Sequence, residues 1–354
     1  MFSYIIRRLL FLIPTFLGIT IISFGIFQLA PGGPIESYMA QMRFSGGTGG
    51  GGGDSGAGAS GSGVSESRGS SSSASAEVIE ELKKKYGFDK PIHERYLIWL
   101  KNVVTLDFGY SYTYGKKVSE LIASKLPVSI RFGLASFILA YLICIPLGIF
   151  KALRDGSSFD LATSFTVFVM YSVPTYMLGI ILIFFFAGGS HWDFFPLGGL
   201  ESLDAEKLSF YERIKDQLWH MVLPLICFTI AGFARMTILM KNSLLEEIGK
   251  DYVRTARAKG LSEKIVIGKH ALRNSLIPLA TDFGELVTVF FASNLLIEQI
   301  FSLDGFGKLF YDAALSRDYP LLMGSVFIGA GLGLIARLIS DVTYVLVDPR
   351  INFD

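Results

Sequence analysis

Three acidic side chains stand inside one apolar run towards the C-terminal end of the chain. Asp282, Glu285 and Glu298 interrupt residues 279–302. A charged group at the centre of a bilayer costs roughly 2.5–3.5 kcal/mol, so such groups usually face a bundle interior or a water-filled cavity. The three acids could line a substrate path, with Glu285 and Glu298 contacting an amine, or they could be partners in helix packing. The sequence leaves both interpretations open.

A basic segment, residues 241–278, immediately precedes this run. It carries eight cations: Lys241, Lys250, Arg254, Arg257, Lys259, Lys264, Lys269 and Arg273. The pattern predicts a short helix that stops at Gly260, a helix start at Ser262 and a second helix that ends at Pro278. Because alanines offer little bulk, another protein could approach this backbone closely. We therefore expect docking into a cleft through Thr255, Ala256, Arg257, Ala258, Lys259, Gly260 and Leu261. The alternative is a loop that only sets topology and touches anionic headgroups.

Groupings typical of enzymes are not found in the sequence. His93-Glu94 is the only His-Glu pair, and Leu97 stands where a metalloprotease motif needs its second histidine. No phosphate-binding Gly-x-x-x-x-Gly-Lys-Ser/Thr occurs. Cys144 and Cys227 lie in apolar runs, where they act as small hydrophobes. We expect no catalytic, metal or cofactor site in this chain, so its energy source must be a separate motor.

The elements that position these residues are membrane helices. Of the 354 residues, 51% are hydrophobic and only 18% charged, and the mean hydropathy is +0.48, which is too apolar for an ordinary soluble protein. A spanning helix needs about 20 apolar residues. Six runs meet this requirement, with the acid-containing run the weakest: 9–30, 132–150, 161–190, 218–240, 279–302 and 320–347. The first is too long for a typical signal peptide, so we expect it to be retained.

The distribution of Lys and Arg predicts the orientation. Residues 241–278 hold eight of them, whereas the short loop 303–319 holds only Lys308 and Arg317. Since short cytoplasmic loops carry the excess of positive charge, the basic segment and both termini are predicted to be cytoplasmic. The net charge of +1 gives no reason to expect nucleic acid as a partner.

The sequence divides into residues 1–30 with the first span, an outer segment 31–127, and a transmembrane core 128–354. Within the outer segment, residues 45–76 are almost wholly Gly, Ser and Ala and predict a flexible linker. Short helices are predicted at 77–86, 91–104 and 118–125, the last leading to Pro127. Together they would form a small outer cap that either contacts a delivery protein or is purely structural.

Arg337 and Asp341 lie four residues apart near the end of the last span. This spacing puts them on one face of a helix. We expect them to pair with each other or with a neighbouring element.

Residues 251–278 resemble the EAA loop of bacterial ABC-importer permeases. Nearly the whole chain is similar to the dipeptide and oligopeptide permeases of the "B" type, and within them to the Yej-type group, which shares the Gly-rich insert. The matching motifs are Ala30-Pro31-Gly32-Gly33-Pro34, Tyr86-Gly87-Phe88-Asp89-Lys90-Pro91, Asp107-Phe108-Gly109 and Asp348-Pro349-Arg350. Two positions depart from the wider pattern: Arg254 stands where the pattern opens with an acid, and Arg273 where it has a proline.

This resemblance implies an all-α type I importer permease fold in the bacterial inner membrane. It implies a coupling helix that inserts into one of two cytoplasmic ATPase subunits, which bind ATP and Mg. It also implies a second, similar but different permease chain, a periplasmic binding protein and surrounding lipid. The substrates would be oligopeptides, including peptide antibiotics of the microcin C kind, moved by alternating access. The rival interpretation is an ion-coupled secondary transporter, which predicts inverted repeats that we do not find.

Overall fold

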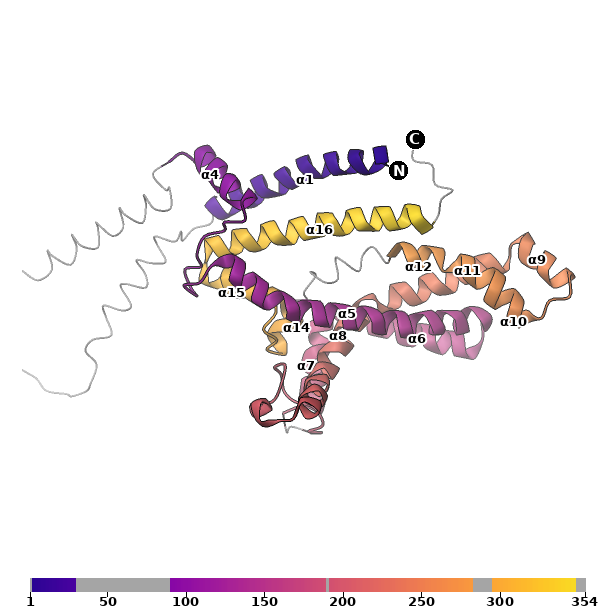
Figure 1. Cartoon of the computed structure of the whole chain (residues 1–354). Helices are drawn as coiled ribbons and strands as arrows, with labels where there is room; N and C mark the ends of the chain where they lie inside the picture. The colour runs from indigo at the N-terminus through magenta and orange to yellow at the C-terminus, as the bar shows by residue number, and fades with distance from the viewer. Residues whose placement is uncertain (1, 30–89, 189–190, 283–294, 348–354) are drawn as a thin grey trace, which may run out of the picture. The chain divides into compact units, whose positions relative to one another are not determined.

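A computed structural model describes residues 2–29, 90–188, 191–282 and 295–347, and in these ranges the chain is helical with no β-strand beyond isolated bridges (Figure 1). Four helices are long and apolar enough to cross a membrane. They are α1 (Phe2–Leu29), α5 (Val118–Leu153), α8 (Phe210–Ile248) and α16 (Tyr319–Val347). They cover the predicted spans 9–30 (up to Leu29), 132–150, 218–240 and 320–347, so four of the six are confirmed as long apolar helices.

The predicted third span, 161–190, is not one straight helix. It consists of α6 (Ser158–Ser172) and α7 (Thr175–Phe186), which meet at an angle of 97°. Pro174 explains the break, because the residue before a proline is driven out of the helical region. Val173 indeed has φ −88° and ψ 122°. At 1.5 Å per residue, neither helix alone covers the ~30 Å hydrocarbon core, so the pair counts at most as one broken span.

The predicted fifth span, 279–302, is described only at its two ends. These ends are α12 (Ile277–Asp282) and α14 (Leu295–Ile300), and residues 283–294 between them lie outside the described residues. In the outer segment, α4 (Ile92–Val104) matches the helix predicted at 91–104. The linker at 45–76 and the helix at 77–86 also lie outside the described residues.

The helix predicted at 118–125 does not end before Pro127. Instead α5 runs on through Pro127 and Pro146 to Leu153. A proline inside a helix costs about 3 kcal/mol or more, but it removes only one backbone donor. The packing of α5 on both sides of Pro127 outweighs that cost, since Ile122 and Phe132 are each 1% exposed.

The long helix α8 begins at a capping box. The hydroxyl of Ser209 accepts from the backbone of Glu212, and the Glu212 carboxylate accepts from the Ser209 N–H at 3.0 Å. Such reciprocal bonds satisfy two of the orphan donors at a helix start. The short 3₁₀ helix η1 (Ala205–Lys207) precedes this cap, and α15 (Phe306–Ser316) lies between α14 and α16.

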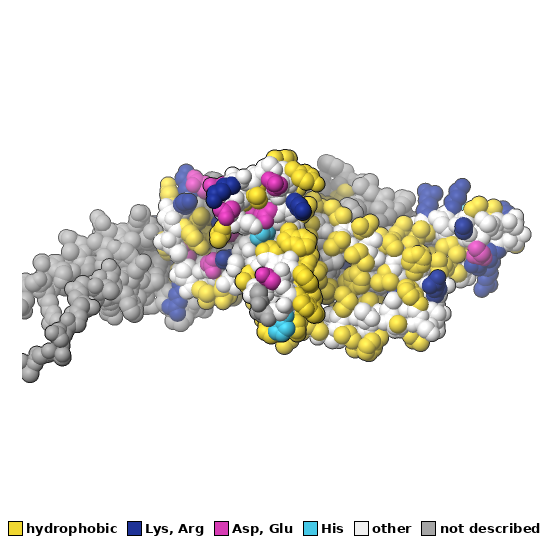
Figure 2. Space-filling model, turned by 90° about the horizontal axis from the view of Figure 1, so that it is seen from below, with side chains coloured by type: hydrophobic (Ala, Val, Ile, Leu, Met, Phe, Trp, Pro, Cys, Tyr) yellow, Lys and Arg dark blue, Asp and Glu magenta, His cyan; other side chains and the backbone are white. Residues whose placement is uncertain are grey.

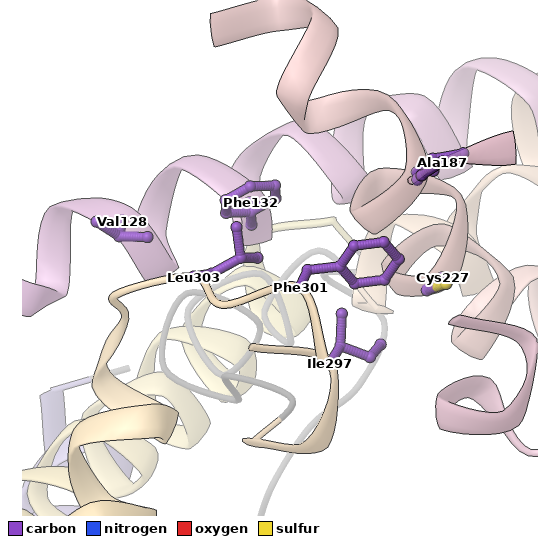
Figure 3. Close-up of a cluster of buried hydrophobic side chains, with 8 residues drawn as sticks. Val128, Phe132, Ala187, Cys227, Ile297, Phe301 and Leu303 are labelled. Atoms are coloured by element: carbon purple, nitrogen blue, oxygen red, sulfur yellow. The ribbon is translucent and has the colours of Figure 1, made fainter. Parts of the chain in front are cut away.

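The described chain forms two compact units. The first comprises Met1–Phe16, Glu120–Asp312 and Ile328–Asp354, and the second comprises Leu17–Ser119 and Ala313–Phe327. In the first unit, a buried cluster joins α5, α8, α14 and the segments that follow α7 and α14 (Figure 3). Its members are Val128, Phe132, Ala187, Leu223, Cys227, Ile297, Phe301 and Leu303.

Phe301 fixes the close approach of two segments in this cluster. The Gly199 N–H donates to the Phe301 carbonyl at 2.9 Å. A Cβ at Gly198 would lie 2.5 Å from that same oxygen, so only glycine fits there. A Cβ at Gly179 in α7 would lie 3.2 Å from the Phe301 ring. The fold therefore needs glycine at position 198 and a small residue at position 179.

The second unit is held by aromatic side chains. The ring of Phe24 lies 5.4 Å from Tyr96 and 5.8 Å from Trp99, and Trp99 lies 6.4 Å from Phe327. The hydroxyl oxygens of Thr20 and Tyr96 are 3.0 Å apart. These contacts pack α4 against the ends of α1 and α16 that belong to this unit.

A fully buried acid, Asp318, completes the second unit. Its carboxylate accepts from the Ser111 hydroxyl at 2.5 Å and from the Thr113 N–H at 3.0 Å. The Leu321 N–H donates to its other oxygen at 3.3 Å, so Asp318 is also the N-terminal cap of α16.

A second buried charge cluster ties α5, α6 and α8 together in the first unit. Lys151, 1% exposed, lies 3.0 Å from the Asp160 carboxylate and donates to Thr163 at 2.9 Å and Ser164 at 2.7 Å. Lys241 contacts the other Asp160 oxygen at 2.7 Å. One carboxylate thus compensates two lysines from two helices.

Removing this shared carboxylate should destabilise the protein severely. In Asp160→Asn, Lys151 loses its buried counter-charge and Lys241 keeps only the exposed Asp155, 2.8 Å away. Breaking a buried ion pair costs about 3–5 kcal/mol. Lys151→Met should cost less, because Lys241 still pairs with Asp160. Thermal unfolding of the detergent-purified protein measures both variants.

Lys207→Met is the matched control. Its pair with Asp204 is short, at 2.6 Å, but the two side chains are 81% and 75% exposed. Exposed pairs contribute at most about 1 kcal/mol. Equal unfolding midpoints for Asp160→Asn and Lys207→Met would contradict the structural role of the buried cluster.

Candidate coupling surface and membrane acids

The predicted docking helix is α9 (Asp251–Ala258). Val253 and Ala256 point inward, at 0% and 6% exposed, and join a buried cluster with residues of α5 and α8. At 100° per residue the opposite face presents Arg254, Thr255 and Ala258, and all three are exposed. The two alanines therefore differ. Ala258 is exposed, as we expected of both alanines. Ala256 is instead buried in the cluster with residues of α5 and α8.

Gly260 ends this helix, as the sequence predicts. The N–H of Gly260 donates to the Arg257 carbonyl at 2.9 Å, and that of Leu261 to the Ala256 carbonyl at 3.4 Å. This pair of bonds is the Schellman motif, which needs a left-handed residue after the helix. Gly260 has φ +79°, and an added Cβ would meet nothing within 4 Å. The glycine is thus required by the backbone conformation and not by crowding.

The second part of the segment differs from the single helix that was predicted. It comprises α10 (Glu263–Ile265), a π-helical turn η2 (Val266–Ala271) and α11 (Leu272–Ser275). Pro278 does not end this helix but stands second in α12, where its missing N–H costs nothing. Arg257 and Glu263 pair across the turn at 2.7 Å.

A polar cluster that the sequence did not predict fixes α9 to its neighbours. Lys250 contacts the Glu247 carboxylate at 2.5 Å, and the Tyr252 hydroxyl donates to the same carboxylate. The Asn274 side chain donates to the Tyr252 hydroxyl at 3.1 Å. Burial, together with the Glu247 carboxylate, raises the pKa of Tyr252, so the phenol stays a donor. No periodicity links residues 247, 252 and 274, so no sequence signal identifies them.

Further bonds join the same segment to the spans. Ser243 of α8 donates to the Ser275 carbonyl at 2.9 Å, and Tyr141 of α5 donates to the Leu279 carbonyl at 2.9 Å. These two bonds join α11 to α8 and α12 to α5.

Of the three membrane acids, the structure describes the side chain of Glu298 alone. It is 1% exposed, and its carboxylate accepts from the Ser129 hydroxyl and the Lys308 N–H, each at 2.9 Å. A Cβ added at Gly305 would lie 2.5 Å from the carboxyl carbon of Glu298, which is closer than real Cβ atoms approach. Glu285 and the Asp282 side chain lie outside the described residues. In this conformation Glu298 links α5 and α14 to the first turn of α15.

Asp341 finds its partner on another helix. Its carboxylate lies 3.0 Å from Arg8 of α1. Of the two pairings that the sequence allowed, the one with a neighbouring element is confirmed. Arg337 is exposed on the same helix.

No group of three or more His, Cys, Asp or Glu in the described ranges is arranged to hold a metal ion. The candidate site is a short helix, α9, with one face buried against α5 and α8 and the other exposed.

These features define a helical subunit of a membrane transport system. Residues 144–353 match the family described as binding-protein-dependent transport system inner membrane component, and the chain belongs to this family. The assignment does not favour the ion-coupled secondary transporter that the sequence also allowed.

Similar proteins cover the full length. The chain is 45% identical to the inner membrane ABC transporter permease protein YejB of Escherichia coli O157:H7, over 99% of both chains. It is 45% identical to the peptidoglycan transport system permease protein YejB of Agrobacterium fabrum, over 99% of this chain and 98% of the other. It is 38% identical to the oligopeptide transport system permease protein AppB of Bacillus subtilis, over all of both chains.

Substitutions at Glu298 distinguish its two candidate roles. If it is a packing partner, Glu298→Ala strands the Lys308 N–H and the Ser129 hydroxyl and should cost about 1–3 kcal/mol of stability. Glu298→Gln, which keeps one acceptor, should cost less. Thermal unfolding of the purified protein measures both.

Glu206→Ala, at an exposed 3₁₀ turn, is the control and should leave the midpoint unchanged. An unchanged midpoint in Glu298→Ala together with lost substrate uptake would instead assign Glu298 to the substrate path.

Proposed function

We propose that this chain is the permease subunit of an ATP-driven, binding-protein-dependent importer of oligopeptides, and that it receives the motor's motion at α9. The observation that carries the proposal is the construction of α9. Its inner face is buried, its end is fixed by the Schellman turn at Gly260, and its outer face is exposed. A short helix held in this way is suited to transmitting force without bending.

The substrate class rests on the similar proteins. Their names give oligopeptides, peptidoglycan and, at 32% identity, dipeptides for a permease of Escherichia coli. Peptide bonds are what these substrates share. Peptide antibiotics of the microcin C kind would belong to the same class.

The proposed complex contains a second, similar but different permease, two ATPase subunits that bind ATP and Mg, and a periplasmic binding protein. One chain supplies one coupling helix, whereas the motor is a pair of ATPases, so a second permease is needed. The chain itself would carry no catalytic residue. Apolar side chains that stand exposed on α5 and α6 would contact lipid or that second permease: Ile138, Leu142, Phe165 and Phe168.

The orientation follows from the charge distribution. The basic segment 241–278 and both termini would face the cytoplasm, and residues 31–127 the periplasm. ATP-driven closure of the motor would push on residues 255–261. The polar cluster around Tyr252 would pass this push to α8 and so switch the bundle between outward-open and inward-open states.

Gly260→Val tests the coupling role. A β-branched residue at φ +79° is strained by about 1–2 kcal/mol, which should shift the docking surface while the buried face of α9 holds. We expect at least tenfold lower uptake of a labelled oligopeptide into cells, with normal amounts of the protein in the membrane.

Gly115→Val is the matched control, because Gly115 also has a positive φ, +62°, and open space around its Cβ, but lies in the predicted periplasmic segment. Normal peptide uptake by Gly260→Val would overturn the coupling role.

A further inference from the structure

Charged side chains meet where α1 and α16 lie side by side in the first unit. Arg8 of α1 lies 3.0 Å from the Asp341 carboxylate of α16. A Cβ added at Gly331 of α16 would lie 3.8 Å from the Phe16 ring of α1, so the helices also approach each other at a second point. From the first point to the second, residue numbers rise along α1 and fall along α16. The two helices are therefore antiparallel (Figure 1).

Two further arginines flank this ion pair. Arg7 is the neighbour of Arg8, and its guanidinium lies 5.9 Å from the centroid of the Phe11 ring. Arg337 precedes Asp341 by four residues, so it stands on the same side of α16 as the acid. Both arginines are exposed, and in the described ranges no ion pair or hydrogen bond engages either guanidinium. We call this group the arginine cluster; its members are Arg7, Arg8, Arg337 and Asp341.

The arginine cluster lies at a membrane boundary. Residues 9–29 of α1 contain no charged side chain. At 1.5 Å per residue they extend about 31 Å, which matches the ~30 Å hydrocarbon core of a bilayer. Arg8 therefore lies at the level of the lipid headgroups, and its ion pair holds Asp341 there. Arg337 stands one helical turn, about 6 Å, further into the apolar part of α16.

Arg337 differs in this respect from the other cations near the apolar helices. Figure 2 shows an apolar surface that ends at the Lys and Arg side chains of α9 to α11, which follow the apolar run of α8. Arg337 instead stands inside the apolar run 320–347. A charged side chain at that depth is costly, and arginine lowers the cost by extending its guanidinium to an anion at the headgroup level.

Exposed apolar side chains border the arginine cluster on both helices. Leu10 and Ile13 of α1 are 59% and 52% exposed, and Ile335 and Ile339 of α16 are 50% and 42% exposed. The cluster itself has three cations and one acid, which give it a net charge of +2. Its ligand must therefore combine a negative head with apolar chains.

We propose that the arginine cluster binds an anionic phospholipid. The lipid phosphate would accept hydrogen bonds from Arg7 and Arg337, because the planar guanidinium matches the geometry of phosphate oxygens. The acyl chains would lie along the exposed apolar side chains of α1 and α16. Basic pockets between membrane helices bind anionic headgroups in this way. A zwitterionic lipid fits less well, since its ammonium group would lie beside a cluster that is already positive.

Arg7→Gln with Arg337→Gln tests the proposal, because it removes two cations and keeps the pair of Arg8 with Asp341. The measurement is the dissociation constant of phosphatidylglycerol for the detergent-purified full-length chain, obtained by native mass spectrometry, with phosphatidylcholine as the neutral reference. We expect phosphatidylglycerol to bind the double variant about tenfold more weakly than the wild type, because charge-assisted bonds to phosphate are lost.

Lys116→Gln with Lys117→Gln is the matched control. It also removes two exposed cations, but in the predicted periplasmic segment, and should leave lipid binding unchanged. If the double arginine variant unfolds at a lower temperature than the wild type, Arg7→Gln alone takes its place. This single change at the exposed start of α1 should weaken phosphatidylglycerol binding about threefold.

Three results would overturn the lipid site. One is wild-type affinity for phosphatidylglycerol in the arginine variants. Another is equal affinity of the wild-type chain for phosphatidylglycerol and phosphatidylcholine, which would show that the cluster does not select an anion. The third is a difference between wild type and variant that disappears when the chain is purified together with a second permease, because the partner would then cover the cluster.

Discussion

A charged group that is buried away from water is costly unless it is paired and hydrogen-bonded, so each buried charge of this protein needs a partner within the chain. Asp160 meets this need for Lys151 and Lys241, and Glu298 is satisfied by Ser129 and the start of α15. In both cases the partners come from different helices. Charges that are costly to bury thus become contacts that fix one helix against the next.

Contacts within the chain also fix α9 to its neighbours. Two backbone bonds close α9 at Gly260, and the Glu247–Tyr252–Asn274 cluster joins α8, α9 and α11. These bonds do not involve the exposed face of α9, which carries Arg254, Thr255 and Ala258, so a partner could contact that face. Rigidity towards the bundle and exposure towards the solvent are the two properties that a force-transmitting helix requires.

The break between α6 and α7 shows how one residue redirects a span. Pro174 turns the chain by 97°, and α7 then packs against α8 and α14. Gly179 lets α7 approach Phe301, and Gly198 lets the next loop approach the same residue. Phe301 therefore gathers segments that are more than a hundred residues apart in sequence.

The sequence alone determined what depends on composition and local geometry. Apolar runs of about 20 residues predicted the long helices, and Gly260 predicted the end of α9, because only glycine adopts φ +79° without strain. It misjudged Pro127 and the straightness of 161–190, because a proline's effect depends on the packing around it. Nor could it choose a partner for Asp341 or find the contacts of Glu298 and Tyr252. Those partners lie on other helices, and only tertiary packing decides which helices meet.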